Sequence, residues 1–185
     1  SLGRCKTYIL RAQTFAGASA GNFMIAQLRG TPADQRFWGK RMRQKGSRVP
    51  LLLPSGDGAL EHRFQFVHVD DVARLMAYIV RRTVSDRDLT VLNVAGRGEP
   101  LSLRACLQEA RLKPMHVPGT ALLRNVQGIF CRLGISDIAP EAVFYALGSF
   151  TVDTTRLRLF LGEDYRKVIQ YTCDQALRES FVHSS

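Results

Sequence analysis

The sequence predicts an α/β protein with a helical C-terminal portion, because two patterns follow one another along the chain. Up to about Leu112, short runs of β-forming residues alternate with amphipathic helical patterns, whereas from Val117 the patterns are helical. Strands that alternate with helices are typical of a parallel sheet covered by helices. The chain has 185 residues, of which 45% are hydrophobic, so it is long enough to bury one core. One globular unit is therefore expected.

Four runs are expected to form strands, because they are short, apolar and rich in β-forming residues. Clusters of glycine, proline and small polar residues follow several of them, for example the turn-forming segment 54–58. The four runs span residues 7–15, 49–53, 64–69 and 89–95.

The clearest helix follows the third run. Asp70 is expected to cap its first turn, and Asp71 to complement the positive end of its dipole. Arg81 and Arg82 complement the negative end. Its apolar residues recur at helical spacing and predict one buried stripe. They are Val72, Leu75, Met76, Ile79 and Val80.

Six further helical stretches are predicted from apolar periodicity and from residues suited to helix ends. Ser102 and Asp153 are expected to cap two of them, and Gly134 and Gly162 to end two of them. The stretches span residues 23–28, 103 to about 112, 122–133, 141–147, 154–161 and 173–181.

The net charge of +10 is densest between Arg36 and Arg48, where six cations occur without an acid. Phe37 and Trp38 lie beside these charges, so a base or a lipid headgroup could bind there. No nucleic-acid fold motif accompanies the segment, and a solvated surface loop is therefore expected. The charge still leaves an anionic partner, nucleic acid included, open.

Composition argues against several classes of protein. No apolar run reaches the roughly 18 residues that suggest a transmembrane helix, and no basic start precedes an apolar stretch. Neither a membrane span nor a signal peptide is predicted, so a cytoplasmic location is expected. The four cysteines form no C-x-x-C pair and have no histidine at zinc-ligand spacing, which predicts buried free thiols and no metal site. They are Cys5, Cys106, Cys131 and Cys173.

Four segments carry motifs in a fixed order along the chain. The first is Ile9-Leu10-Arg11-Ala12 followed by Gly17, and the second is Phe66-Val67-His68-Val69-Asp70-Asp71-Val72-Ala73. The third runs from Leu92-Asn93-Val94-Ala95-Gly96 to Ser102-Leu103, and the fourth from Val152-Asp153-Thr154-Thr155-Arg156 to Leu161-Gly162. Together they resemble the second half of extended short-chain dehydrogenases/reductases, the NAD-dependent epimerase/dehydratase family. Ala12 and Ala18 depart from it, since the family usually has proline at these positions.

The resemblance implies the C-terminal portion of a Rossmann-like NAD(P)-binding fold with a small, mostly helical substrate-binding lobe. Residues 1–185 would form a single partial domain. Within it, 7–112 would hold late Rossmann strands and helices with substrate-lobe insertions, and 113–185 a mainly helical substrate-side part. The family's G-x-x-G-x-x-G turn and Tyr-x-x-x-Lys pair do not occur in this sequence. No catalytic residue is therefore assigned, and whether the chain is an enzyme stays open.

The resemblance also implies a cofactor, NAD or NADP. By the same likeness, Ala12, Gln13, Thr14 and Phe15 would leave a strand and pass near the nicotinamide. Packing at a strand end explains these four residues equally well. His68 is interpreted as a structural, hydrogen-bonded histidine rather than a catalytic one.

Three residues match positions that contact substrate in nucleotide-sugar epimerases of the family. Asn22 and Phe23 would contact the substrate, although Asn22 could instead serve as a helix cap alone. Arg63 would hold a nucleotide diphosphate through its forked guanidinium, and a surface arginine at a strand start is the alternative.

Two functions follow. The first is the substrate-side half of an NAD(P)-dependent epimerase, dehydratase or reductase that acts on a nucleotide-sugar-like or other hydroxyl substrate. Such a half is expected to be inactive alone, and upstream codons would encode the missing motifs. The alternative is a non-catalytic module, derived from the family, that binds a nucleotide, nucleic acid or acidic lipid, with an affinity that falls with salt. Homo-oligomers are compatible with both.

Overall fold

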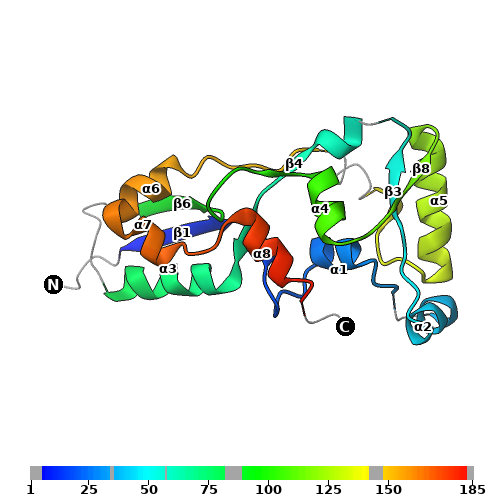
Figure 1. Ribbon diagram of the computed structural model, residues 1–185, viewed down its shortest axis with the longest axis horizontal. Helices are drawn as coiled ribbons and strands as arrows, with labels where there is room; N and C mark the ends of the chain where they lie inside the picture. The colour runs from blue at the N-terminus through cyan, green and yellow to red at the C-terminus, as the bar shows by residue number, and fades with distance from the viewer. Residues whose placement is uncertain (1–5, 34–35, 57, 82–88, 142–147, 183–185) are drawn as a thin grey trace. The chain divides into compact units, whose positions relative to one another are not determined.

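The computed structural model describes residues 6–33, 36–56, 58–81, 89–141 and 148–182 (Figure 1). The chain has α/β structure with parallel strand pairs, as the sequence predicts. It divides into two compact units, and each is built from several stretches of chain. Unit 1 comprises 1–20, 64–101 and 150–185, and unit 2 comprises 21–63 and 102–149. Cys5, Arg82 and residues 142–147 of the expected helix 141–147 lie outside the described residues.

In its described residues, unit 1 combines four strands with a group of helices. The strands are β1 (Thr7–Ala12), β2 (Thr14–Ala16), β5 (Phe66–His68) and β6 (Leu89–Val94). The helices are α3 (Val69–Arg81), α6 (Thr155–Leu161), the 3-10 turn η3 (Gly162–Asp164), α7 (Tyr165–Val168) and α8 (Cys173–Glu179).

The part of unit 2 that the structure describes consists mainly of helices. Its helices are α1 (Phe23–Arg29), α2 (Phe37–Gln44), the 3-10 turn η1 (Gly58–Glu61), α4 (Leu103–Glu109) and α5 (Thr120–Leu133). Its strands are β3 (Leu51–Pro54) and β8 (Pro114–Val117). The short strands β4 (Arg63–Phe64) and β7 (Leu101–Ser102) lie where the chain passes from one unit to the other.

The first predicted strand forms two strands, because its partner changes at Gln13. β1 pairs in parallel with β6, from Thr7 opposite Leu89 to Ala12 opposite Val94. The Gln13 N–H then donates to the Val94 carbonyl at 2.9 Å, and β2 continues in parallel with β5. A single run of β-forming residues thus pairs with two different strands, and the local sequence pattern does not reveal this change.

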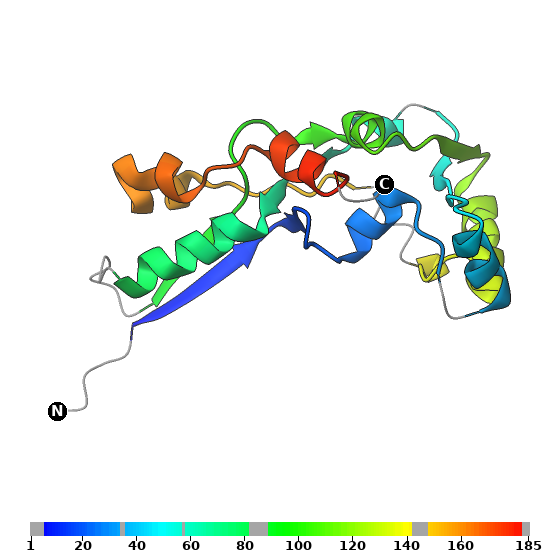
Figure 2. The same cartoon turned by 60° about the horizontal axis from the view of Figure 1, so that its bottom comes forward.

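The core of unit 1 lies between the β1–β6 pair and the helices α3 and α6. Figure 2 shows α3 running alongside β1. The predicted buried stripe of α3 is confirmed at three of its five positions. Leu75 is fully buried, and Val72 and Ile79 pack against the core. Met76 and Val80 are exposed instead, because they lie on the outer edge of that stripe. The buried members of the cluster are Val67, Leu75, Leu92, Val94, Leu157, Leu161, Val168 and Ile169.

His68 is buried and hydrogen-bonded, as predicted. It is 3% exposed, its Nε2 lies 2.9 Å from Glu179 Oε2, and its ring stacks on Tyr171 with 3.8 Å between centroids. Its Nδ1 accepts the Asp70 N–H at 3.1 Å. Because α3 already begins at Val69, His68 rather than Asp70 covers a first-turn amide, which corrects the expectation that Asp70 caps the helix. Gly17 has φ +119°, and a Cβ there would lie 2.6 Å from His68 Nε2. The histidine therefore joins α3, α8 and the loop after β2.

Asp71 corrects the expectation of a simple helix-start residue. Its side chain is fully buried, and its two oxygens accept the N–H groups of Gln170 at 2.9 Å and Tyr171 at 3.1 Å. It also pairs with the Arg74 guanidinium. The carboxylate thus fixes the connection between α7 and α8 to the first turn of α3.

Unit 2 is organised around a parallel strand pair and α5. β3 pairs with β8 from Leu51 opposite Pro114 to Pro54 opposite Val117. Leu52, Val117 and Leu123 form a buried cluster on which Val126 and Phe130 of α5 pack. The strand β8 was not predicted, because its four residues begin with proline and include two exposed side chains.

Predicted helix ends agree well with the structure. Ser102 Oγ accepts the Ala105 N–H at 3.2 Å, as expected of the N-cap of α4. Asp153 lies one residue before the N-cap of α6, which is Thr154, and its Oδ1 accepts the Thr155 N–H at 2.8 Å. Gly134 ends α5 with a left-handed φ of 68°. The chemistry of helix ends is local, so sequence alone locates these residues.

The segment 36–48 is not a solvated loop, which corrects the expectation from its charge. It contains α2, whose buried Gly39 packs so closely that a Cβ would collide with the carbonyl oxygens of Ala33 and Gly134. Three of its arginines donate to backbone carbonyls. They are Arg36 to Arg132, Arg43 to Pro32, and Arg48 to Leu28, Arg29, Ala110 and Arg111.

The described cysteines predict an order of reactivity. Cys106 and Cys173 are buried and Cys131 is half-buried. Burial raises the pKa of the Cys173 thiol. Because the thiolate is the reactive form, we expect iodoacetamide at neutral pH to alkylate Cys131 at least about tenfold faster than Cys173, measured by peptide mapping. The rates should converge in urea, and equal rates in the native protein would contradict the burial of Cys173.

Within the described ranges, no helix is both long enough and apolar enough to cross a bilayer.

Candidate functional site

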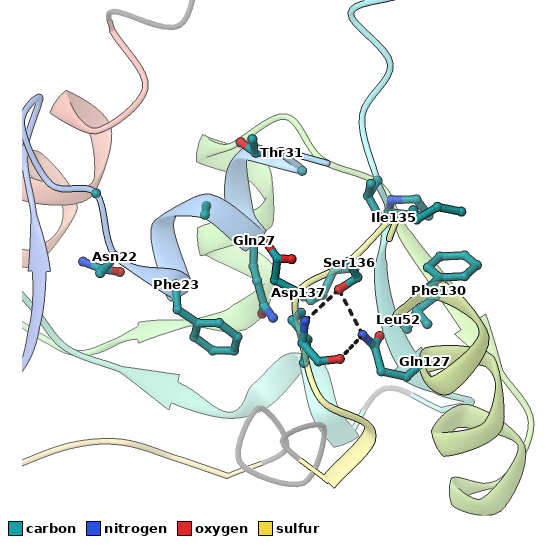
Figure 3. A pocket seen from close by; sticks show the side chains of 17 residues that line it. Asn22, Phe23, Gln27, Thr31, Leu52, Gln127, Phe130, Ile135, Ser136 and Asp137 are labelled. Atoms are coloured by element: carbon teal, nitrogen blue, oxygen red, sulfur yellow. Dashed lines mark hydrogen bonds between the residues drawn. The ribbon is translucent and has the colours of Figure 1, made fainter. Parts of the chain in front are cut away.

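A pocket of about 340 Å³ opens within unit 2 (Figure 3). Three structural parts surround it: α1 and the residues just before it, the start of β3, and α5 together with the segment that follows it. The lining residues are Gly21, Asn22, Phe23, Ala26, Gln27, Gly30, Thr31, Val49, Pro50, Leu51, Leu52, Gln127, Phe130, Ile135, Ser136, Asp137 and Ile138.

α1 supplies one wall of this pocket. Asn22 caps the helix, because its Oδ1 accepts the Ile25 N–H at 3.1 Å. The cap fixes where the helix begins and so places Phe23 on its first turn and Gln27 one turn later. The Phe23 side chain is 52% exposed although it is apolar. Asn22 therefore acts as a helix cap, as expected, and lines the pocket as well.

α5 and the segment after it supply the opposite wall. Gln127 is 3% exposed, and its Nε2 donates to Ser136 Oγ at 3.0 Å and to the Ile138 carbonyl at 2.9 Å. The Ile138 N–H donates to the same hydroxyl at 3.2 Å. These bonds, drawn in Figure 3, hold residues 136–138 against α5. Ser136 and Asp137 are thereby presented by a fixed segment.

Sequence reasoning did not find this second wall. The available signal was Gln127 itself, a polar residue beside the apolar stripe of α5 that is formed by Val126 and Phe130. A buried amide needs hydrogen-bond partners, so a returning segment could have been anticipated there. Which segment returns depends on the left-handed turn at Gly134 and on the packing that follows it.

The pocket is suited to an uncharged, partly apolar group. Phe23 and Phe130 contribute aromatic rings, Gln27 an amide, and Asp137 a carboxylate that can accept hydrogen bonds from hydroxyl groups. None of the described residues that line it is Lys, Arg or His. A sugar or a base therefore fits this lining better than a phosphate, which needs cations or clustered N–H groups.

The other predicted site residues lie elsewhere. Arg63 is exposed at the start of β4 and does not line the pocket, and its backbone N–H donates to Ser149 Oγ at 3.0 Å. The residues expected near a nicotinamide belong to unit 1. They occupy the end of β1 and the start of β2, with Ala12 opposite Val94, Gln13 between the strands, Thr14 opposite Phe66, and Phe15 41% exposed.

The described residues contain no group of three or more His, Cys, Asp or Glu side chains that could hold a metal ion.

No family model matches the chain, and no curated protein matches its sequence. Solved structures do match it. The UDP-glucose 4-epimerase of Thermus thermophilus, in complex with NAD, matches with a TM-score of 0.53 and 15% identity, over 96% of this chain and 46% of that enzyme. The chain shares its fold with part of that enzyme. At this identity the likeness concerns the fold alone.

Two further structures match at lower similarity. The dTDP-glucose 4,6-dehydratase of Bacillus anthracis str. Ames, in complex with NAD, matches with a TM-score of 0.49 and 13% identity, over 94% of this chain and 42% of that one. A UDP-galactose 4-epimerase matches with a TM-score of 0.47 and 12% identity, over 95% and 44%. The chain thus spans less than half the length of the enzymes that it matches.

Proposed function

We propose that this chain is the substrate-side, C-terminal part of an NAD(P)-dependent epimerase, dehydratase or reductase. The observation that carries the proposal is the shared fold with UDP-glucose 4-epimerase over 96% of the chain. The substrate is a nucleotide-sugar-like molecule or a related hydroxyl compound. Hydride transfer needs the glycine-rich turn and the Tyr-x-x-x-Lys pair, so this chain alone is expected to bind substrate without turning it over.

We assign different parts of the substrate to different residues. Phe23 and Phe130 provide apolar ring surface for a base or a sugar face, and Gln27 and Asp137 provide polar groups for its edges. Since no cation lines the described pocket, we assign the diphosphate to a residue outside it. Arg63 is exposed, carries a permanent charge and can bind two phosphate oxygens at once.

The cofactor part of the proposal concerns unit 1. NAD or NADP would contact Ala12, Gln13, Thr14 and Phe15. At these residues the chain stops pairing with β6 and begins to pair with β5. These residues occupy the C-terminal end of the parallel strand β1 and the start of β2, and α/β sheets bind ligands near the C-terminal ends of their strands. The bulk of the cofactor site would come from outside this chain, so weak cofactor affinity is expected.

Nucleotide titrations of the chain test the proposal. We expect binding of UDP-glucose, measured by isothermal titration calorimetry, to weaken about tenfold in Phe23→Ala, because a ring that contacts a base or sugar is lost. Arg63→Ala should weaken binding of UDP-glucose and UDP about tenfold and leave uridine unchanged, because a guanidinium binds the diphosphate and uridine has none.

Two exposed residues outside the pocket provide matched controls. Phe37→Ala removes an exposed ring, and Arg81→Ala removes an exposed cation. Neither should change the affinity for uridine-containing ligands. A folded chain that binds none of the three ligands at millimolar concentration would contradict the proposed function.

A further inference from the structure

The outward face of α2 has a composition that neither the core of unit 2 nor the pocket explains. Of the six cations between residues 36 and 48, three arginines donate to backbone carbonyls, as described above. Lys40, Arg41 and Lys45 are exposed, and no acidic residue lies in this segment. Lys40 and Arg41 lie within α2 and Lys45 is its C-cap residue, and all three side chains are exposed to solvent.

Two aromatic rings share this surface with the cations. Phe37 is 66% exposed and Trp38 is 50% exposed, and their rings meet edge to face with 5.4 Å between centroids. Arg41 follows Phe37 by four residues and Lys45 follows Arg41 by four, so they lie on neighbouring turns of one side. The opposite side carries Gly39, buried against the Ala33 and Gly134 carbonyls. This packing fixes which side of α2 faces outward.

We propose that the outward face of α2, formed by Phe37, Trp38, Lys40, Arg41 and Lys45, docks on an anionic membrane surface. Aromatic rings favour the boundary between headgroups and acyl chains, and cations beside them pair with acidic headgroups. The net charge of +10 adds a long-range attraction to such a surface. The contact is peripheral, because the helix lies along the surface rather than across the bilayer.

The same face is less suited to nucleic acid. A helix that reads a duplex presents amides or arginines to base edges, whereas the first turn here presents two apolar rings. Phe37 and Trp38 meet at 80°, so they do not form two parallel platforms on which successive bases could stack. The lipid surface is therefore the occupant that the geometry favours.

Trp38 makes the proposal directly measurable, because it is the one tryptophan in the sequence. The full chain is mixed with vesicles of phosphatidylcholine alone and with vesicles in which about a third of the lipid is phosphatidylserine. We expect cosedimentation with the acidic vesicles only, together with a blue shift of Trp38 emission as the indole leaves water. Binding should weaken as salt rises, because screening reduces the attraction.

Two charge-matched variants locate the surface. Lys40→Gln/Arg41→Gln/Lys45→Gln and Arg81→Gln/Arg156→Gln/Arg166→Gln each remove three exposed cations and lower the net charge from +10 to +7. The α2 variant should bind acidic vesicles about 100-fold more weakly, whereas the control should change by less than about threefold. Phe37→Ala should weaken binding about tenfold and leave Trp38 as the reporter.

Several results would overturn the proposal. They are the absence of phosphatidylserine-dependent binding, an equal loss in the two charge variants, or vesicle binding that leaves Trp38 emission unshifted. Quenching of Trp38 by single-stranded RNA without vesicle binding would assign the face to nucleic acid instead. Circular dichroism establishes that each variant is folded, and Arg41→Gln alone, with a smaller expected loss, replaces the triple variant if that one unfolds.

Discussion

Replacing Asp71 by alanine is expected to lower the free energy of unfolding by about 3–5 kcal/mol, because it leaves buried polar partners without their acceptor. The carboxylate is fully buried and accepts the N–H groups of Gln170 and Tyr171. Arg74 would also lose its ion-pair partner. Urea unfolding followed by circular dichroism measures the loss.

The neighbouring aspartate provides the control. Asp70 is exposed, with 61% of its side chain accessible, so Asp70→Ala should cost less than about 1 kcal/mol. Asp71→Asn keeps one acceptor oxygen and most of the shape, so its effect should fall between the two. Equal unfolding midpoints for Asp70→Ala and Asp71→Ala would show that the bonds from Asp71 to Gln170 and Tyr171 contribute nothing to stability.

Replacing Arg48 by alanine is expected to lower the free energy of unfolding by about 2–3 kcal/mol. Its Nε donates to the Arg29 carbonyl at 2.8 Å and its Nη1 to the Arg111 carbonyl at 2.9 Å. Its Nη2 is shared between Leu28 at 3.2 Å and Ala110 at 2.8 Å. Two of these carbonyls belong to the last residues of α1, and the other two to the residues just after α4. One guanidinium thus binds carbonyl groups at the C-terminal ends of two helices, where they lack a partner within the helix.

Two variants separate charge from geometry at this position. Arg48→Lys keeps the charge, but one ammonium group cannot reach four carbonyls, so it should lose more than half of the stability that Arg48→Ala loses. Lys45→Ala removes an exposed cation of the same segment and should change the free energy of unfolding by less than about 0.5 kcal/mol. Full rescue by lysine would mean that Arg48 acts through charge alone.

Local chemistry explains which elements could be predicted. The helix start at Asn22, the cap at Ser102 and the helix end at Gly134 each depend on bonds between residues three or four positions apart. The α/β class follows from the same kind of evidence, since strand and helix periodicities are visible within short windows. Two of the proposed substrate residues, Asn22 and Phe23, lie on the pocket wall for this reason.

Long-range contacts explain what could not be predicted. Gln127 holds the second pocket wall in place by donating to Ile138, which lies beyond the tight turn at Gly134. At Gln13, one predicted strand changes its pairing from β6 to β5. The basic segment has the composition of a loop, but Arg48 reaches carbonyls up to 63 positions away. None of these partners can be identified from neighbouring residues.

The sequence by itself determined the α/β class, the helix ends and a likeness to an enzyme family, because each depends on side chains close together in the chain. Only the tertiary structure decided that the chain forms two units, that Asp71 is buried, and that α2 presents rings and cations outward. The Asp71 carboxylate is bound by amides 99 and 100 positions away. Burial and pairing at such separations follow from how the whole chain packs, which no local pattern encodes.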